Sequence, residues 1–366
     1  MLPLCAFFVI LFSLPVASHL IGGLCAHKAL DPCAPPRSRN DIRHIVMLSG
    51  PRHGSSFTMS LLADKRTLYL GELLESGAPH FMVHAPVVDM TAYMGALIIL
   101  NERLPGTKFS DLGDKTGLAG NVSARAHLNA STMETMRLAL EDLAISRGQD
   151  TILYKVFYFD SPRDTFKGSE MKFLQSVQRT RCSQFIIARR NFLQIEVSLL
   201  IAQETGHWWN RNSSAHAKTR IDLVNTKRSL WFALARDILF EEVSTGASGG
   251  VFSFSYEQVL EIEAKRKMSH LDAARAVRSF LVGGLAEAAR TSVTPFELCA
   301  KENDDFLLGR LDLYMRQDNR DMLRDKVENY NELAMTWTSI CLGVARRQKL
   351  QEPNRTCFET PWRLPA

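Results

Sequence analysis

The sequence has no long run of basic residues and no stripe in which basic and aromatic side chains alternate. These patterns are typical of nucleic-acid-binding proteins. The net charge of +5 and the pI of about 8.8 come from 44 Lys and Arg against 39 Asp and Glu. This small excess is spread along the chain. It suits an anionic ligand, and we expect no nucleic-acid partner.

The chain also lacks an internal repeat, a low-complexity segment and a zinc pattern among its 7 cysteines. We therefore expect no metal site. In an oxidising compartment, disulfides are the default state of the cysteines that follow the N-terminal segment. Cys341 and Cys357 are the pair that their proximity near the C-terminus suggests.

Residues 1–27 contain no Asp, Glu, Lys or Arg, and residues 4–16 are almost all apolar. This pattern predicts a secretory-pathway signal over residues 1–26, either a cleaved peptide or a signal anchor that spans the bilayer once. A basic segment before the apolar run is missing, which fits neither version well. Residues 27–40 form a short proline-rich stem, and residues 41–366 form a single luminal domain.

Four N-x-[ST] sequons agree with a chain that enters the secretory pathway, either as a Golgi protein or as a secreted one. N-glycosylation is expected at some of Asn121, Asn129, Asn212 and Asn354.

The stretch from His44 to Leu62 organises the chain. An apolar run, HIVML at residues 44–48, predicts a buried strand, and apolar residues at helical spacing resume after Gly54. The loop between them is small and rich in hydroxyls, and the N–H groups at a helix start bind anions. It is not a Walker loop, because no lysine follows the second glycine. The alternative is an ordinary turn with a serine at the helix start.

Strands and helices alternate along the chain, which predicts an α/β, P-loop-like three-layer fold with a mainly parallel sheet flanked by helices. The strands are expected at residues 44–48, 67–71, 151–158, 184–188 and 251–255. The helices are expected at residues 57–62, 86–104, 131–147, 192–204, 217–243, 269–285 and 321–347.

The loop, PRHGSS at residues 51–56, resembles the 5′-phosphosulfate loop of the PAPS-dependent sulfotransferases (PAPS is 3′-phosphoadenosine 5′-phosphosulfate). Five stretches in the same order carry this resemblance, nearest to the bacterial-type and Golgi carbohydrate branches. It implies that the loop holds the phosphosulfate of PAPS, with His53 at a position where the family usually has serine. The residues implied are Arg52, His53, Gly54, Ser55, Ser56 and Phe57.

Two further stretches resemble the family's catalytic positions. GEL at residues 71–73 implies that Glu72 takes the proton of the acceptor hydroxyl, which is chemistry that a carboxylate can perform. YKVFY at residues 154–158 implies that Lys155 faces the sulfuryl or bridging oxygen, where charge develops. The alternatives are a solvated glutamate and a lysine that reaches out to solvent.

The two remaining stretches resemble other parts of the cofactor site, namely the binding site for the 3′-phosphate and a C-terminal loop. In FIIARRNFLQIEVS at residues 185–198, Arg190 and Ser198 match that site, and an arginine offers a phosphate two parallel hydrogen bonds. MRQDNR at residues 315–320, followed by VENYNEL, is similar to a C-terminal loop that closes over the cofactor, which implies roles for Arg316 and Arg320. FSYEQVL at residues 254–260 matches a strand exit that we interpret as structural.

The resemblance implies a sulfotransferase that moves the sulfuryl group of PAPS to an acceptor hydroxyl, on a glycan or glycoprotein, without a metal. Protein tyrosine is the alternative acceptor. A relative of the fold that binds nucleotide or glycan without turnover is another alternative. A kinase or nucleotidase would need a Walker lysine and a carboxylate for Mg²⁺, and neither is evident.

Overall fold

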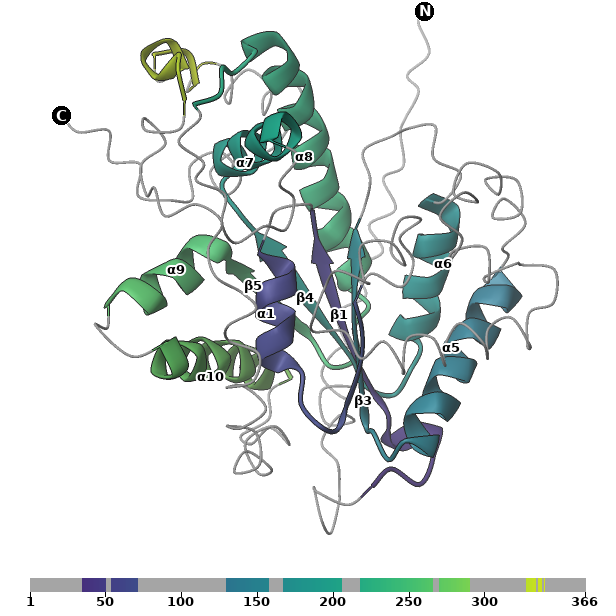
Figure 1. Cartoon of the computed structure of the whole chain (residues 1–366). Helices are drawn as coiled ribbons and strands as arrows, with labels where there is room; N and C mark the ends of the chain where they lie inside the picture. Colours follow the sequence, from purple (N-terminus) through teal and green to yellow (C-terminus); the bar gives the residue numbers. More distant parts are fainter. Residues whose placement is uncertain are drawn as a thin grey trace, which may run out of the picture.

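The computed structural model describes residues 35–50, 54–71, 130–157, 167–205, 218–265 and 270–289, together with residues 327–333, 335–337 and 339. Within these ranges the chain forms a parallel sheet with helices on both faces (Figure 1). The predicted α/β three-layer fold is therefore confirmed. The predicted signal segment, the predicted helix at 86–104 and the four sequons lie outside the described residues.

In the described part of the chain, five strands form the sheet in the order β2-β3-β1-β4-β5, and each neighbouring pair is parallel. The strands are β1 (Arg43–Ser49), β2 (Thr67–Gly71), β3 (Thr151–Phe157), β4 (Ser183–Arg189) and β5 (Val251–Ser255). The chain leaves β1 toward β2 at one edge and leaves β4 toward β5 at the other. Ligands of such sheets bind where adjacent strands send their connections in opposite directions. Here that place is at the carboxyl ends of β1 and β4.

Helices cover both faces of the sheet (Figure 1). One face carries α1 (Ser55–Leu62), α9 (Tyr256–Lys265) and α10 (His270–Ala288); the other carries α5 (Ala130–Ser146), α6 (Lys167–Gln178) and α8 (Leu223–Ser244). α7 (Phe192–Thr205) follows β4 and packs beside α8. None of the helices in the described ranges is long and apolar enough to cross a membrane.

The helices differ most clearly from the sequence prediction at α8, α6 and α9. α8 begins at Leu223 and not at residue 217, because the Asp222 carboxylate accepts from the N–H groups of Val224 (2.9 Å) and Asn225 (3.2 Å). Such a cap satisfies the first donors of a helix and fixes its start. α6 and α9 were not predicted, since both are short and carry many polar residues.

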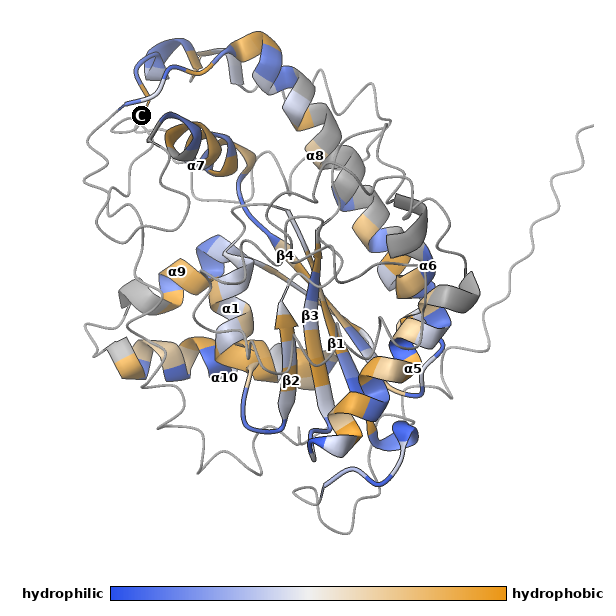
Figure 2. Ribbon diagram, turned by 45° about the vertical axis from the view of Figure 1, so that its right-hand side comes forward, coloured by the Kyte–Doolittle hydropathy of each residue, from blue (hydrophilic) through white to orange (hydrophobic). Residues whose placement is uncertain are grey.

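The main core lies between the sheet and its two helix layers, and apolar residues are concentrated in the strands and along α10 (Figure 2). A second, smaller group of buried residues, the α7 cluster, joins α7 and α8 to the C-terminal segment. It contains Phe192, Leu193, Val197, Ile221, Leu230, Ala233, Val327, Leu333 and Trp337.

The α7 cluster is fastened by polar contacts as well as by packing. The Asn329 side chain accepts from the Ile221 N–H (3.0 Å) and donates to the Ile221 carbonyl (2.9 Å), as a neighbouring strand would. The rings of Phe192 and Trp337 stack with centroids 6.0 Å apart. The stretch at 327–333, which resembles part of the sulfotransferase C-terminal region, therefore docks on the helix that follows β4.

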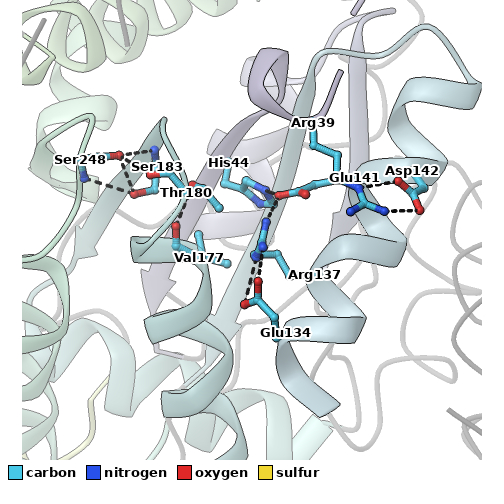
Figure 3. A network of polar contacts seen from close by, with 10 residues as sticks. All are labelled: Arg39, His44, Glu134, Arg137, Glu141, Asp142, Val177, Thr180, Ser183 and Ser248. Atoms are coloured by element: carbon cyan, nitrogen blue, oxygen red, sulfur yellow. Dashed lines mark hydrogen bonds and ion pairs between the residues drawn. The ribbon is translucent and has the colours of Figure 1, made fainter. Parts of the chain in front are cut away.

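A buried polar group, the α5 network, lies between β1 and α5 (Figure 3). His44 Nε2 is 2.9 Å from Glu141 Oε1, and both side chains are almost fully buried. Arg137 donates to Glu134 and to Glu141, each about one turn away from it on the same helix. This arrangement places a half-buried arginine between two carboxylates, so each carboxylate has a cationic partner.

The beginning of the described chain is tied to the same helix. Arg39 donates from Nε and Nη2 to the two oxygens of Asp142, at 2.7 and 2.9 Å. Asp41 closes a short turn by accepting from the N–H groups of Arg37 and Ser38. The last residues of the predicted stem therefore pack against α5.

Cys182, the one cysteine in the described ranges, is a buried thiol at the start of β4. The expectation that the cysteines beyond the signal form disulfides is therefore wrong for Cys182. The predicted pair of Cys341 and Cys357 lies outside the described residues.

Candidate functional site

The loop after β1 ends at a glycine that begins α1. Gly54 has a left-handed backbone (φ 71°, ψ 10°) and occupies the N-cap position, where it offers no side chain to the first N–H groups of the helix. Its carbonyl accepts from the Thr58 N–H at 3.1 Å, so the helix starts regularly. The open N–H groups and the helix dipole favour an anion at this end. Ser55 and Ser56 follow directly.

Lys155 brings a cation to the start of α1. It lies in the middle of β3 with 3% of its surface exposed, and its Nζ donates to Ser56 Oγ at 2.8 Å. Side chains alternate between the faces of a strand, so Tyr154 faces α6 while Lys155 faces α1. Burying a charge is costly unless it is paired, and here the ammonium is held against the hydroxyl-rich helix start.

Two consecutive arginines at the end of β4 point to opposite faces of the sheet. Arg189 donates to Glu241 of α8 at 2.6 Å and to Ser253 of β5. The Arg190 guanidinium instead lies over the ring of Tyr256, with its carbon 5.1 Å from the ring centroid. A cation over an aromatic face is stabilised by about 0.5–2 kcal/mol, depending on its exposure. Arg190 is thus the arginine on the same side as α1 and α9.

The backbone after Arg190 is fixed by the neighbouring strand exit. Glu257 accepts from the Asn191 N–H at 3.0 Å, and Asn191 is itself buried. The Asn191 side chain accepts from the Gln194 N–H (3.3 Å), and its carbonyl accepts from Ile195. The start of α9 therefore holds the start of α7, and α7 carries Ser198.

Ser198 and Phe57 take different places among the predicted cofactor residues. Ser198 is half-buried on α7, eight positions beyond Arg190, and α7 packs in the α7 cluster. Phe57 is half-buried, and its side chain packs against the main core. Its carbonyl accepts from the Ser60 hydroxyl at 2.6 Å. Phe57 thus helps to fix α1, next to the serines of the loop.

The structure brings part of the predicted site together: Gly54, Ser55, Ser56, Lys155 and Arg190 lie at the carboxyl edge of the sheet. Predicted residues outside the described ranges are Arg52, His53, Glu72, Arg316 and Arg320. Glu72 follows Gly71, the last residue of β2, and Gly71 is in register with Tyr154.

One carboxyl group of α7 has a shifted pKa. Burial raises the pKa of Glu196, because the ionised form loses contact with water. Glu196 lies between Arg190 and Ser198 in the sequence, so the helix of the proposed phosphate site carries a carboxyl group that burial pushes toward its neutral form.

Tyr256 belongs to this site, although the sequence around it, FSYEQVL at residues 254–260, indicates only a structural strand exit. β5 lies next to β4, with Ser255 in register with Arg189. The residue after β5 therefore lies beside Arg190. Arg190 is the first residue after β4, and Tyr256 is the first residue after β5. Once β5 is expected beside β4, these two matching positions point to Tyr256.

Comparisons of the chain with protein-family models, with curated proteins and with solved structures find no match. The resemblance to sulfotransferases therefore depends on the five stretches of sequence.

Proposed function

We propose that this protein is a PAPS-dependent sulfotransferase of the secretory pathway that sulfates a hydroxyl group of a glycan. The contact between Lys155 Nζ and Ser56 Oγ carries this proposal. The Lys155 ammonium lies at the start of a glycine-capped helix, and Arg190 lies at the exit of β4, the strand beside β1. These two cationic groups suit a ligand with two separate anionic groups.

The phosphosulfate would bind at the start of α1, where it meets N–H groups, the hydroxyls of Ser55 and Ser56, and the Lys155 ammonium. The 3′-phosphate would bind Arg190, whose planar guanidinium can make two parallel hydrogen bonds. β4 lies directly beside β1, and Leu48 pairs with Ile187, so the two anion sites belong to neighbouring strand ends. This separation suits two phosphates attached to one ribose.

In the transfer step, the acceptor oxygen attacks the sulfur atom, and the bond between sulfur and the bridging oxygen breaks. The electron pair of that bond goes to the departing 5′-phosphate, and the hydroxyl proton goes to the Glu72 carboxylate. By analogy with phosphoryl transfer, negative charge grows on the leaving oxygens. Lys155, with Arg52, would stabilise this charge, because fixed cationic donors in a site that excludes water act strongly on charge that develops there.

Glycans are the acceptor class that fits the predicted compartment. An apolar N-terminal segment and four sequons indicate the secretory pathway, where glycan hydroxyls are abundant. Tyrosine residues of secreted proteins are the alternative, and an acceptor screen decides between the two.

The first experiment measures ligand-induced stabilisation of the full-length chain. Adenosine 3′,5′-bisphosphate, the product nucleotide, should raise the free energy of unfolding by about 2.7 kcal/mol at a hundredfold excess over Kd. ATP with Mg²⁺ is the comparison ligand. A shift with ATP and Mg²⁺ but none with the bisphosphate would reject the proposal in favour of a kinase or nucleotidase.

The second experiment measures sulfate transfer from labelled PAPS to glycan, tyrosine-peptide and small-molecule acceptors. Glu72→Gln should lower turnover by about 10²–10⁴-fold, the usual contribution of a positioned acid–base group, while PAPS affinity barely changes. Glu75→Gln, three positions further along, is the matched control and should keep turnover. PAPS binding without transfer to any acceptor would support a binding protein instead.

A further inference from the structure

We propose that Tyr256 is a positioning residue: its ring fixes the spacing between the Gly54 loop and Arg190 and so sets the selectivity for a nucleotide with phosphates at both 5′ and 3′ positions. The proposal rests on the proposed function. It adds a residue that connects the two phosphate sites and that touches neither the reacting atoms nor, in its assigned role, the ligand.

The first observation is the approach of the ring to the loop. A Cβ atom placed on Gly54 would lie 2.2 Å from Cε2, 2.3 Å from Cδ2 and 2.9 Å from Cζ of Tyr256. Real Cβ atoms do not come this close to other atoms, so the tyrosine ring occupies the space that any other side chain at position 54 would need. Glycine here allows the left-handed turn and admits the ring.

The second observation is that the same ring supports Arg190. The guanidinium carbon lies 5.1 Å from the ring centroid. One side chain thus contacts both the helix start that would hold the 5′-phosphosulfate and the arginine that would hold the 3′-phosphate. Gly54 and the Arg190 guanidinium both contact one rigid ring, so a movement of the ring changes the position of both phosphate sites.

The third observation explains why the ring stays in place. Tyr256 is the first residue of α9, and the next residue, Glu257, accepts from the Asn191 N–H at 3.0 Å. Two consecutive residues of α9 therefore hold two consecutive residues after β4. The Glu257 side chain thus ties the start of α9 to the backbone that follows Arg190, which keeps Tyr256 beside the arginine.

This arrangement bears on selectivity because an arginine side chain has many rotamers, and ordering them opposes binding. A guanidinium already held over a ring loses less freedom when a phosphate binds. Removing the ring should therefore weaken the contribution of the 3′-phosphate to affinity, while the loop still binds a 5′-phosphate.

The test measures selectivity in the full-length chain, as the Kd for adenosine 5′-phosphate divided by the Kd for adenosine 3′,5′-bisphosphate. One charged hydrogen-bonding group predicts a ratio of about 10 to 100 in the wild type. Tyr256→Phe keeps the ring and should keep the ratio. Tyr256→Met fills similar space without an aromatic face, and its ratio should fall below that of the wild type, toward that of Arg190→Ala. The double variant Tyr256→Met with Arg190→Ala should have the same ratio as Arg190→Ala alone.

Thermal unfolding without ligand shows whether each variant folds. If Tyr256→Met does not fold, Gly54→Ala tests the contact from the other side: its new methyl group must displace the ring, so the ratio should fall although position 54 belongs to the 5′ site. The role of Tyr256 is overturned if a folded Tyr256→Met variant keeps the wild-type ratio. The same holds for a folded Gly54→Ala variant if it is used instead. Either result leaves the proposed function intact. A wild type that binds neither nucleotide, or both equally, overturns the proposed function and this inference with it.

Discussion

The α5 network and the candidate site both contain buried or half-buried cationic side chains, but the contacts of these cations differ. In the α5 network, Arg137 contacts two carboxylates, Glu134 and Glu141, and the latter also contacts His44 (Figure 3). In the candidate site, Lys155 contacts a hydroxyl, and the Arg190 guanidinium lies over an aromatic ring. Both groups of residues belong to the same sheet and its helices, so the difference lies in the local chemistry.

The pKa values of carboxyl groups in the two regions are shifted in opposite directions. Hydrogen bonds from Arg137 lower the pKa of Glu134, so this group stays ionised and paired. Burial raises the pKa of Glu196 on α7. A cation that is matched by carboxylates stabilises the fold and has little attraction left for a ligand. Arg137 is therefore a structural charge, and the variants below test whether Lys155 and Arg190 are binding charges.

The largest expected effect is on stability in the α5 network. Arg137→Met leaves the buried Glu141 carboxylate without its arginine, and breaking a buried pair from one side typically costs about 3–5 kcal/mol. Chemical denaturation of the variant and wild type measures this loss. Arg137→Met combined with Glu141→Gln removes both charges and should recover a large part of it. A single variant as stable as the wild type would contradict the structural role.

The next effect is on catalysis in the candidate site. Lys155→Met removes the buried ammonium and should lower turnover by about 10²–10³-fold, the usual consequence of losing one donor to developing charge. Stability should be unchanged or higher, because Met avoids the cost of burying a charge. Lys172→Met on α6, on the other face of the sheet, is the control. Equal turnover of the Lys155 and Lys172 variants would place Lys155 among the structural charges.

Arg190 and its neighbour Arg189 offer a matched pair. Arg190→Ala should weaken binding of adenosine 3′,5′-bisphosphate by about 1.5–3 kcal/mol, the value of a charged hydrogen-bonding group, with little change for adenosine 5′-phosphate. Calorimetry measures both affinities. Arg189→Ala breaks the contacts to Glu241 and Ser253, so it should lower the melting temperature and affect both nucleotides alike. Equal losses for both nucleotides in Arg190→Ala would show that Arg190 does not bind the 3′-phosphate.

The smallest effect is a pH dependence of opposite sign in the two regions. The raised pKa of Glu196 gives a favourable contribution to stability below its unfolded pKa of about 4.3, which is lost as pH rises through the folded value. Glu196→Gln should therefore melt higher than wild type at pH 7 and not at pH 4. The lowered pKa of Glu134 gives a contribution present at neutral pH and lost in acid, so Glu134→Gln should melt lower at pH 7. Shifts of the same sign would contradict this assignment.

The sequence predicts the sheet well because its strands are short apolar runs bounded by turns, as at residues 44–48 and 184–188. The sequence leaves two alternatives for Lys155, the sulfuryl or bridging oxygen and solvent, and its contact with Ser56 is a finding of the structure. The site residues from β1, β3 and β4 were found because each follows or interrupts such a run.

Other features depend on tertiary arrangement. The strand order determines that Tyr256 lies beside Arg190, and no local pattern of residues 254–260 contains that information. The α5 network joins His44 to Glu141, 97 positions apart, and the start of α8 depends on the capping by Asp222. α9 begins at the residue directly after β5, so no turn signal in the sequence separates the strand from the helix.

The bond between Asn329 and Ile221 has a consequence for the order of folding. It joins residues 108 positions apart. Closing such a long loop costs conformational entropy, and the contacts of the small α7 cluster must offset this cost. We expect the sheet to form first and the C-terminal segment to dock late, as a unit that also opens most readily in the native state. In a hydrogen-exchange measurement the Ile221 amide should exchange faster than the amides of β1, and equal protection would show that the two parts open together.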